Sequence, residues 1–168
     1  MTDCFSSEER HRIMSRIKGK NTEPERRVRS FLHEKGFRFR LHRSDLPGSP
    51  DIVLPRYRLA VFVHGCFWHR HRTCSRGTST PQNNREFWLR KFQKNVSRDL
   101  EKERALRSLG WKVLVLWECE IRSGAYAKAL LSELRDTQVH QQDPCTDSGR
   151  RVASSKTSRH FPEPSEAS

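Results

Sequence analysis

Long apolar stretches are absent from this sequence of 168 residues. A helix needs about 18 or more consecutive apolar residues to cross a bilayer, and no such run occurs. The first 20 residues also lack the apolar centre of a secretory signal peptide. We therefore expect a protein without a membrane anchor or secretion signal, which works in the cytoplasm.

Acidic residues are scarce relative to basic ones. The chain has 20 Asp and Glu against 33 Lys and Arg, which gives a formal net charge of +13. From Thr137 onward basic and acidic residues balance at four each, so the whole excess lies in residues 1–136. A domain this basic most often binds a polyanion, because release of counterions from phosphates drives such binding. The alternative is that the charge serves solubility alone.

A disulfide framework is not expected either. The five cysteines are an odd number, and three of them lie near histidines or at the end of a predicted strand. This pattern favours reduced, metal-binding thiols. Residues 137–168 contain six Ser and three Pro but few apolar residues, so we expect a disordered tail. Residues 1–136 then form one domain.

Capping boxes predict two helices at the start of the chain. Ser6-x-x-Glu9 opens the first, which ends at Gly19, and Thr22-x-x-Glu25 opens the second, which ends at Gly36. Alternation and short apolar runs predict strands over residues 37–42, 51–54, 59–63 and 111–117, the last of them central in the sheet.

Two more helices are predicted over residues 86–109 and 125–134. The apolar face expected for the longer one consists of Phe87, Leu89, Phe92, Val96, Leu100 and Leu106. Between strand and helix, residues 64–84 form a long polar loop, which in a compact domain usually carries function. The order predicts one α/β domain with a small mixed sheet.

Asp51 opens one strand of a predicted hairpin, and a polar loop leaves the other strand. This layout matches a restriction-like nuclease core, in which the first Asp binds Mg²⁺ through its carboxylate. The E-x-K motif that normally completes such a site is absent, because Val63 and Gly65 stand at its positions. A further ligand there would be the Val63 carbonyl or a water.

The loop begins with the sequence HGCFWHRHRTC, which holds several candidate ligands. Cys66, His71 and Cys74, together with the later Cys119, could form a tetrahedral Cys₃His zinc site. His69 is a rival for the fourth position. His64 and His69 could instead replace the missing lysine as proton acceptors near pH 7. The alternative is that every histidine of the loop is either a zinc ligand or a solvated side chain.

Adjacent aromatic residues lie inside the same loop. Phe67 and Trp68 follow Cys66, and core packing is the default for such side chains. In a basic protein, exposed rings can also wedge between base pairs. Trp88 could join them, although burial in the core is favoured for it.

Three segments resemble the very-short-patch-repair (Vsr-type) mismatch endonucleases: LPGSPDIVLPRYRLAVFVHGCFWHRH, REFWLRKFQKNVSRD and LGWKVLVLWECE. The likeness runs from about Ser6 to Leu134. It implies a restriction-endonuclease-like α/β core, with a small mixed sheet flanked by helices and a structural zinc. The implied activity is a Mg²⁺-dependent nick 5′ to the T of a T:G mismatch, which arises by deamination of 5-methylcytosine.

The resemblance also implies roles for single residues. Asp51 and the Val63 carbonyl resemble the Mg²⁺ ligands, and His69 resembles the general base, assisted by Glu25. His64 resembles a contact to the scissile phosphate. Asp99 resembles a residue that supports the catalytic residues by contact with them. Cys66, His71, Cys74 and Cys119 resemble the zinc ligands. The residues that resemble those at the mismatch are Phe67, Trp68, Trp88 and Met14.

Partners follow from the same resemblance. They are double-stranded DNA with a T:G mismatch, a functionally linked DNA cytosine-5 methyltransferase and other mismatch-repair proteins. Such a role implies association with the nucleoid. The sequence gives no sign of a self-complementary surface, and we expect a monomer.

Overall fold

The computed structural model describes residues 19–139 together with Glu8 and Arg12. The predicted first helix therefore lies almost wholly outside the described residues, as does Met14. The predicted C-terminal segment lies outside them beyond Val139. The described helices are all too short or too polar to cross a lipid bilayer.

A four-stranded mixed sheet forms the centre of the described part. Its order is β1-β2-β3-β4, where β1 is Arg40–Leu41, β2 Ile52–Leu54, β3 Leu59–His64 and β4 Lys112–Trp117. The first three strands are antiparallel, and β3 and β4 are parallel. A 3₁₀ turn, η1 (Pro55–Tyr57), joins β2 to β3, which confirms the predicted hairpin.

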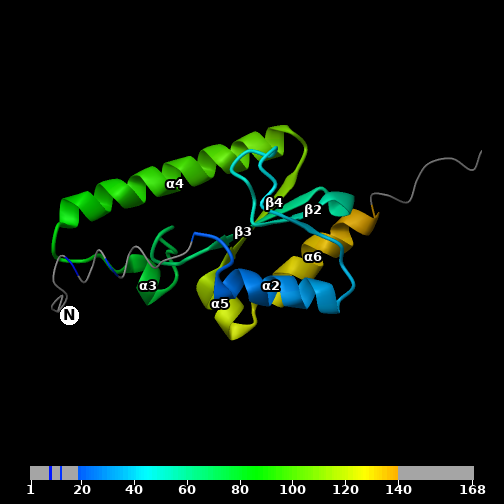
Figure 1. Ribbon diagram of the computed structural model, residues 1–168, viewed down its shortest axis with the longest axis horizontal. Helices are drawn as coiled ribbons and strands as arrows, with labels where there is room; N and C mark the ends of the chain where they lie inside the picture. Colours follow the sequence, from blue (N-terminus) through cyan, green and yellow to red (C-terminus); the bar gives the residue numbers. More distant parts are fainter. Residues whose placement is uncertain (1–7, 9–11, 13–18, 140–168) are drawn as a thin grey trace, which may run out of the picture.

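Helices cover both faces of the sheet (Figure 1). One face carries α2 (Glu23–Glu34), α5 (Glu118–Ser123) and α6 (Tyr126–Val139), and the other carries α4 (Arg85–Ser108). A single-turn helix, α3 (Ser75–Thr78), lies within the loop after β3. The α/β class and the small mixed sheet flanked by helices are therefore confirmed.

Alternation along the strands divides the apolar residues between two cores, because successive side chains point to opposite faces. In β3, Leu59 and Val61 face the helices α2, α5 and α6, whereas Ala60 and Phe62 face α4. His64 continues the second series at the last position of β3. The strand thus delivers a histidine to the side of the sheet on which α4 lies.

Several predicted boundaries differ from the structure. The strand predicted over residues 37–42 pairs only at Arg40–Leu41, although Phe37 and Phe39 still pack partly buried against the core. The strand at residues 111–117 is at the edge of the described sheet, and the prediction of a central strand was wrong. Its apolar run is explained by the helices that cover both of its faces.

The long helix buries only part of the predicted face: Phe92 and Leu106 are buried and Val96 is half-buried, but the other three are not. Its buried residues are Trp88, Phe92, Asp99 and Leu106, whereas Phe87, Leu89 and Leu100 are exposed. The reason lies in its position, because the N-terminal half of α4 extends past the sheet and meets the aromatic side chains of the loop (Figure 1). The prediction also missed the short helices α3 and α5, and α6 continues to Val139.

Candidate active site and metal centres

Two carboxylates, Asp51 directly before β2 and Glu25 in the first turn of α2, form the first part of the site. Asp51 Oδ2 accepts a hydrogen bond from the backbone N–H of Val63 on β3, at 2.8 Å. In a strand, the N–H and C=O of one residue point to the same side, so the Val63 carbonyl is also directed toward Asp51. Burial raises the pKa of Asp51, and the nearby Glu25 charge adds to this. A cation between these oxygens would stabilise both carboxylates in their charged form.

Glu25 is held in place by its own helix end. Its side chain is 3% exposed and accepts hydrogen bonds from the backbone N–H groups of Asn21 and Thr22, at 3.1 and 3.3 Å. The Thr22 hydroxyl donates to it at 2.8 Å, and the Arg29 guanidinium donates at 2.7 Å. The capping box predicted from sequence is confirmed, and it fixes a charged group beside Asp51.

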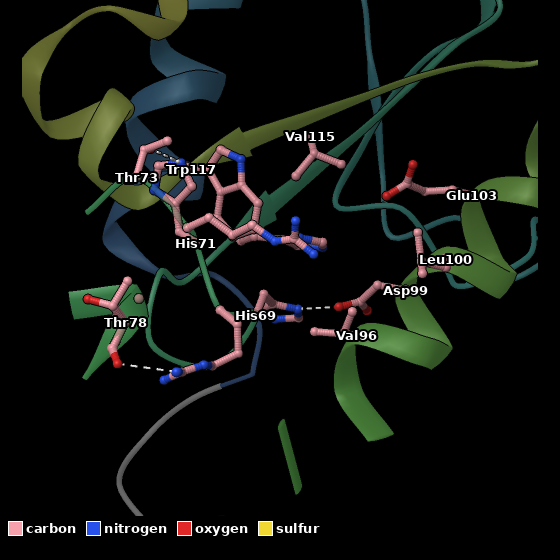
Figure 2. A pocket seen from close by; sticks show the side chains of 14 residues that line it. His69, His71, Thr73, Thr78, Val96, Asp99, Leu100, Glu103, Val115 and Trp117 are labelled. Carbon is pink, nitrogen blue, oxygen red and sulfur yellow. Dashed lines mark hydrogen bonds and ion pairs between the residues drawn. The ribbon is translucent and has the colours of Figure 1, made fainter. Parts of the chain in front are cut away.

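A histidine pair follows at the end of β3. The rings of His64 and His69 stack with their centroids 3.9 Å apart, and His69 Nδ1 is hydrogen-bonded to Asp99 Oδ2 of α4 (Figure 2). Lys102 Nζ lies 3.9 Å from the other oxygen of Asp99. Since Asp99 accepts the hydrogen of Nδ1, Nε2 of His69 is left with a free lone pair for a proton.

Burial and charge set the protonation of this group. Desolvation, together with the charges of His69 and Lys102, lowers the pKa of His64 to about 3. Burial would raise the pKa of Asp99, but the hydrogen bond from His69 and the electrostatic interactions with His69, His64 and Lys102 together hold that pKa below its usual value. At neutral pH the site therefore contains a neutral His64 and a charged Asp99.

One cavity of about 620 Å³ joins these groups. Its lining includes Glu25, His42 and Asp51 on one wall and His64, His69 and Asp99 on another, with Trp68 at its edge. The basic side chains of Lys20, Arg98 and Lys102 also line it. A second, largely apolar pocket of about 650 Å³ lies on the far side of the same histidines, between α4 and β4 (Figure 2).

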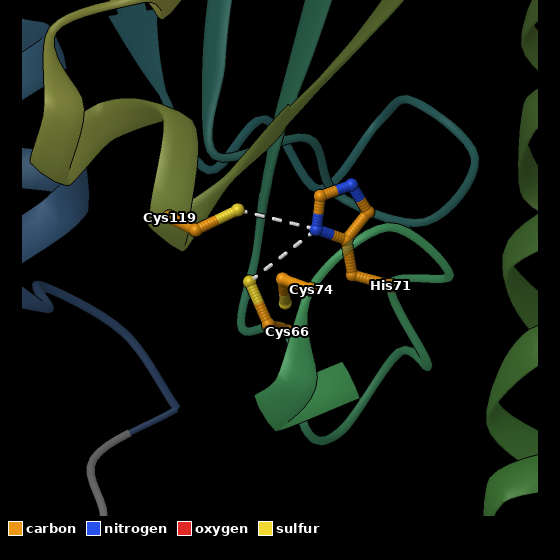
Figure 3. A group of neighbouring side chains, drawn as sticks. All are labelled: Cys66, His71, Cys74 and Cys119. Carbon is orange, nitrogen blue, oxygen red and sulfur yellow. Dashed lines mark hydrogen bonds between the residues drawn. The ribbon is translucent and has the colours of Figure 1, made fainter. Parts of the chain in front are cut away.

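Three thiols and an imidazole converge where the loop meets the start of α5 (Figure 3). The ligand atoms of Cys66, His71, Cys74 and Cys119 all lie within 4.8 Å of one another. His71 Nδ1 is 3.7 Å from the sulfur of Cys66 and 3.2 Å from that of Cys119. Its other ring nitrogen lies 2.9 Å from the Thr73 hydroxyl, which leaves Nδ1 free to act as a ligand.

The chemistry of this cluster fits a metal ion. Burial raises the pKa of the Cys66 thiol to about 12, so a thiolate there requires a cation. Three sulfurs and one nitrogen at these separations are the donor set of a closed, tetrahedral zinc site. The loop is also packed tightly, since a Cβ placed on Gly77 would lie 2.0 Å from the His71 carbonyl oxygen. Only glycine fits at that position.

Aromatic rings from the loop and from α4 form a cluster beside the cavity. Phe67 makes edge contacts with Trp68, Trp88 and Phe92, with ring centroids 5.1, 5.5 and 5.1 Å apart. Trp88 is buried, whereas Phe67 and Trp68 are half-buried. Lys91 Nζ lies 5.2 Å from the Trp68 ring centroid. The cluster thus combines partly exposed rings with a positive charge.

Comparison with known proteins identifies the family. A profile described as "DNA mismatch endonuclease Vsr" matches residues 2–76. The "Type II nicking enzyme V.XorIIP" of Xanthomonas oryzae pv. oryzae is 48% identical over 136 residues, which cover 81% of this chain and 98% of the relative. The chain belongs to the Vsr family of DNA mismatch endonucleases.

Two further relatives agree with this Vsr assignment. The "Type II nicking enzyme V.NmeAIP" of Neisseria meningitidis is 44% identical over 134 residues, covering 80% of this chain and 94% of the relative. The "DNA mismatch endonuclease Vsr" of Escherichia coli is 41% identical over 122 residues, covering 73% and 77%. The predicted membership of a DNA endonuclease family is therefore confirmed.

The structure brings several of the site residues predicted for this Vsr-family chain close together. Asp51 and Val63 are in contact, His71 lies with the three cysteines, and His69 points instead toward Asp99. Glu25 lines the same cavity as His69 but contacts the group around Asp51. Met14 lies outside the described residues.

Sequence reasoning gave no role to some side chains of the site. His42 lies 3.8 Å from Asp51, and Asn95 on α4 donates a hydrogen bond to the Trp68 carbonyl at 3.1 Å. Asn95 and Asp99 are one helical turn apart, so they hold consecutive residues of the loop. The helical spacing of Asn95 and Asp99 was visible in the sequence, but their partners were not.

Proposed function

We propose that this protein is a Mg²⁺-dependent, strand-specific endonuclease that nicks DNA 5′ to the T of a T:G mismatch. The mismatch arises by deamination of 5-methylcytosine within a short recognition sequence, and the nick begins very short patch repair. A DNA cytosine-5 methyltransferase is then its functional partner. The fold is proposed to be restriction-endonuclease-like, with residues 1–136 as the nuclease domain and residues 137–168 as a tail.

The observation that carries the proposal is the shared cavity. A carboxylate centre at Asp51 and a proton-accepting pair, His69 and Asp99, line one space of about 620 Å³. Phosphodiester hydrolysis needs both a cation beside the phosphate and a group that takes a proton from water. A non-catalytic binding module has no need to bring the two together.

Each part of the cavity has a proposed role. Asp51 and the Val63 carbonyl hold Mg²⁺, which when bound neutralises charge on the phosphate and acidifies water. His69 takes the proton at Nε2, and Asp99 holds its ring through Nδ1. His64 is kept neutral by burial, so it contacts the phosphate region as an uncharged hydrogen-bonding group.

Zinc and the aromatic residues support this chemistry from outside the cavity. The proposed zinc at Cys66, His71, Cys74 and Cys119 ties the loop to the end of β4, which fixes the position of His69 two residues from a ligand. Phe67 and Trp68 are proposed to enter the duplex at the mismatch, where unstacking costs a few kcal/mol that new contacts offset. Trp88 supports them from the buried side.

The test uses end-labelled duplexes with one T:G pair in a panel of short palindromic contexts, incubated with Mg²⁺. We expect a nick in the T strand only, and none in matched C:G duplexes. Asp51→Ala should abolish nicking while duplex affinity is kept. Asp45→Ala is the matched control, because that carboxylate is exposed and forms an ion pair with Arg43, away from the cavity.

Other results would decide against the proposal. Equal cleavage of T:G and C:G duplexes would indicate a restriction-type nuclease that acts on unmodified DNA. If the unaltered chain and Asp51→Ala both bind the duplex and neither nicks it in any context, the protein is a non-catalytic DNA-binding module.

A further inference from the structure

His42 completes the carboxylate centre in a way that the function proposed above does not use. It follows β1, whose register pairs Leu41 with Ile52, so His42 comes opposite Asp51. Its backbone N–H donates to the Asp51 carbonyl at 3.4 Å. Two strands that are adjacent in the sheet therefore bring this imidazole to the candidate Mg²⁺ ligand.

The backbone of His42 adopts a strained conformation that turns the ring inward. Its φ is +45°, in the left-handed region that costs a non-glycine residue free energy. The side chain is only 17% exposed, although the two preceding residues of β1 are exposed. The strained backbone therefore accompanies the burial of this imidazole against the carboxylates of Glu25 and Asp51.

Distances around the ring suit a shared cation. His42 Nδ1 lies 3.8 Å from Asp51 Oδ1, which is too long for a hydrogen bond. When two ligands each lie about 2.1 Å from one cation, they are about 3.0 Å apart in cis positions and about 4.2 Å apart in trans positions. The ligand atoms of Glu25, His42 and Asp51 all lie within 4.8 Å of one another.

The other ring nitrogen lies near both Glu25 and Arg29. Nε2 of His42 is 3.7 Å from Glu25 Oε2 and 3.1 Å from Arg29 Nη2. The guanidinium only donates, so without a cation Nε2 accepts and Nδ1 carries the ring hydrogen. Binding of a cation at Nδ1 moves the ring hydrogen to Nε2, which gives up the hydrogen bond from Arg29 and donates toward Glu25 instead. Arg29 keeps its bonds to Glu25 and Asn21.

We propose that His42 is a direct ligand of the catalytic cation, through Nδ1 and together with Asp51, and that Glu25 orients its ring. A carboxylate that fixes a ligating histidine in this way is a common second layer of metal sites. The inference rests on the function proposed above, since it deepens the description of the same site. It assigns a nitrogen ligand to a site otherwise formed by oxygen atoms.

A nitrogen ligand changes which cations the site accepts. Mg²⁺ prefers oxygen, whereas transition-metal ions bind imidazole more readily, and Mn²⁺ is the one closest to Mg²⁺ in its other preferences. The site should therefore bind Mn²⁺ more tightly than Mg²⁺. His42→Asn puts an amide oxygen near the position of Nδ1, so it should keep Mg²⁺ and lose the preference.

The experiment measures ligation directly, on the full zinc-loaded chain with Mn²⁺ added. Pulsed electron paramagnetic resonance should detect coupling between Mn²⁺ and the ¹⁴N nucleus of a bound imidazole in the unaltered protein. Labelling with ¹⁵N-histidine should change this nitrogen signal. His42→Asn should remove the coupling and weaken Mn²⁺ binding roughly 10- to 100-fold. His33→Asn, at an exposed histidine of α2, is the matched control and should change neither.

The outcomes separate this inference from the proposed function. Coupling that is absent from the unaltered protein, or that persists in His42→Asn, overturns the ligand assignment even if T:G nicking with Mg²⁺ is intact. Coupling that His42→Asn removes supports it, even if no duplex is nicked. If His42→Asn does not fold, as judged by zinc content and circular dichroism, His42→Gln replaces it under the same criteria.

Discussion

At the scale of single residues, the site is formed by ionisable groups whose surroundings give each a different state. Burial keeps His64 neutral, with a pKa of about 3, and the hydrogen bond from His69 helps to keep Asp99 charged. His69 lies between them, stacked on the first and bonded to the second. An imidazole held in this way has one nitrogen occupied and the other free to accept a proton.

Replacement of Asp99 tests the role of this pair. Asp99→Asn keeps the shape of the side chain but removes the charge and allows the wrong tautomer of His69. We expect single-turnover nicking of a T:G duplex to fall roughly 10²- to 10⁴-fold, as for loss of a general base. The Kd for the duplex should change less than about twofold, within ±0.5 kcal/mol.

The matched control is Glu101→Gln, at an exposed carboxylate two residues further along α4. It should nick at the original rate. A rate for Asp99→Asn within threefold of the original would show that His69 does not depend on this carboxylate.

At the scale of elements, α4 and the loop after β3 position the site together. The C-terminal half of α4 packs on the sheet through Leu106, while its middle holds the loop through Asn95 and Asp99. The cysteine cluster holds the same loop from the other side, since Cys119 lies at the start of α5, directly after β4. The loop is therefore fixed between a helix and the cysteine–histidine cluster.

Removal of one thiol should loosen the loop. We expect about one zinc per chain in the unaltered protein, by the four-ligand rule, and a clear loss of zinc in Cys119→Ser. The apparent Tm should fall by at least about 5 °C, since 1 kcal/mol is worth about 2–4 °C in a chain of this size.

Cys145→Ser, which replaces a cysteine outside the cluster, is the control and should retain both zinc and Tm. Zinc analysis and thermal melts measure the two quantities independently. A zinc-free preparation of the unaltered protein with an identical Tm would contradict the structural role.

Packing of α4 on the sheet predicts a second effect on stability. Leu106 is fully buried among Leu46, Val53, Ala60 and Phe62. Leu106→Ala leaves a cavity and should lower the free energy of unfolding by about 2–5 kcal/mol. Leu109→Ala, three residues later and 52% exposed, should change it by less than about 0.5 kcal/mol. Denaturant titrations measure both, and equal effects would mean that α4 is not anchored at Leu106.

At the scale of the whole molecule, charge and layering favour binding of DNA at the proposed site. The formal charge of +13 lies entirely in residues 1–136, and basic side chains line the cavity beside the aromatic cluster. The cavity opens at the carboxyl end of the parallel pair β3 and β4, which is where sites of α/β sheets commonly lie. Binding of the duplex should therefore be dominated by phosphate contacts.

Salt dependence measures this contribution. We expect the Kd for a T:G duplex to rise roughly 10³-fold between 50 and 200 mM salt, as for several phosphate contacts. Lys91→Gln should reduce the slope of log Kd against log salt by about one if Lys91 contacts a phosphate. Arg150→Gln, in the neutral C-terminal segment, should leave the slope unchanged. A slope near zero for the unaltered chain would exclude an electrostatic mode of binding.

The sequence by itself determined the parts that depend on neighbouring residues. The capping box at Thr22 and Glu25, the hairpin of β2 and β3 and the clustering of Cys66, His71 and Cys74 could all be predicted, because each is a local pattern. The family could be recognised for the same reason, from motifs that follow one another along the chain.

Only the tertiary structure decided which of these groups meet. The choice between His69 and His71 at the cysteines depends on which way the loop turns, and the buried face of α4 depends on what lies beneath each half of it. His42 comes to Asp51 through strand register. Periodicity gives a side chain its direction from its own element, but pairing across elements depends on packing of the whole chain, which no local pattern contains.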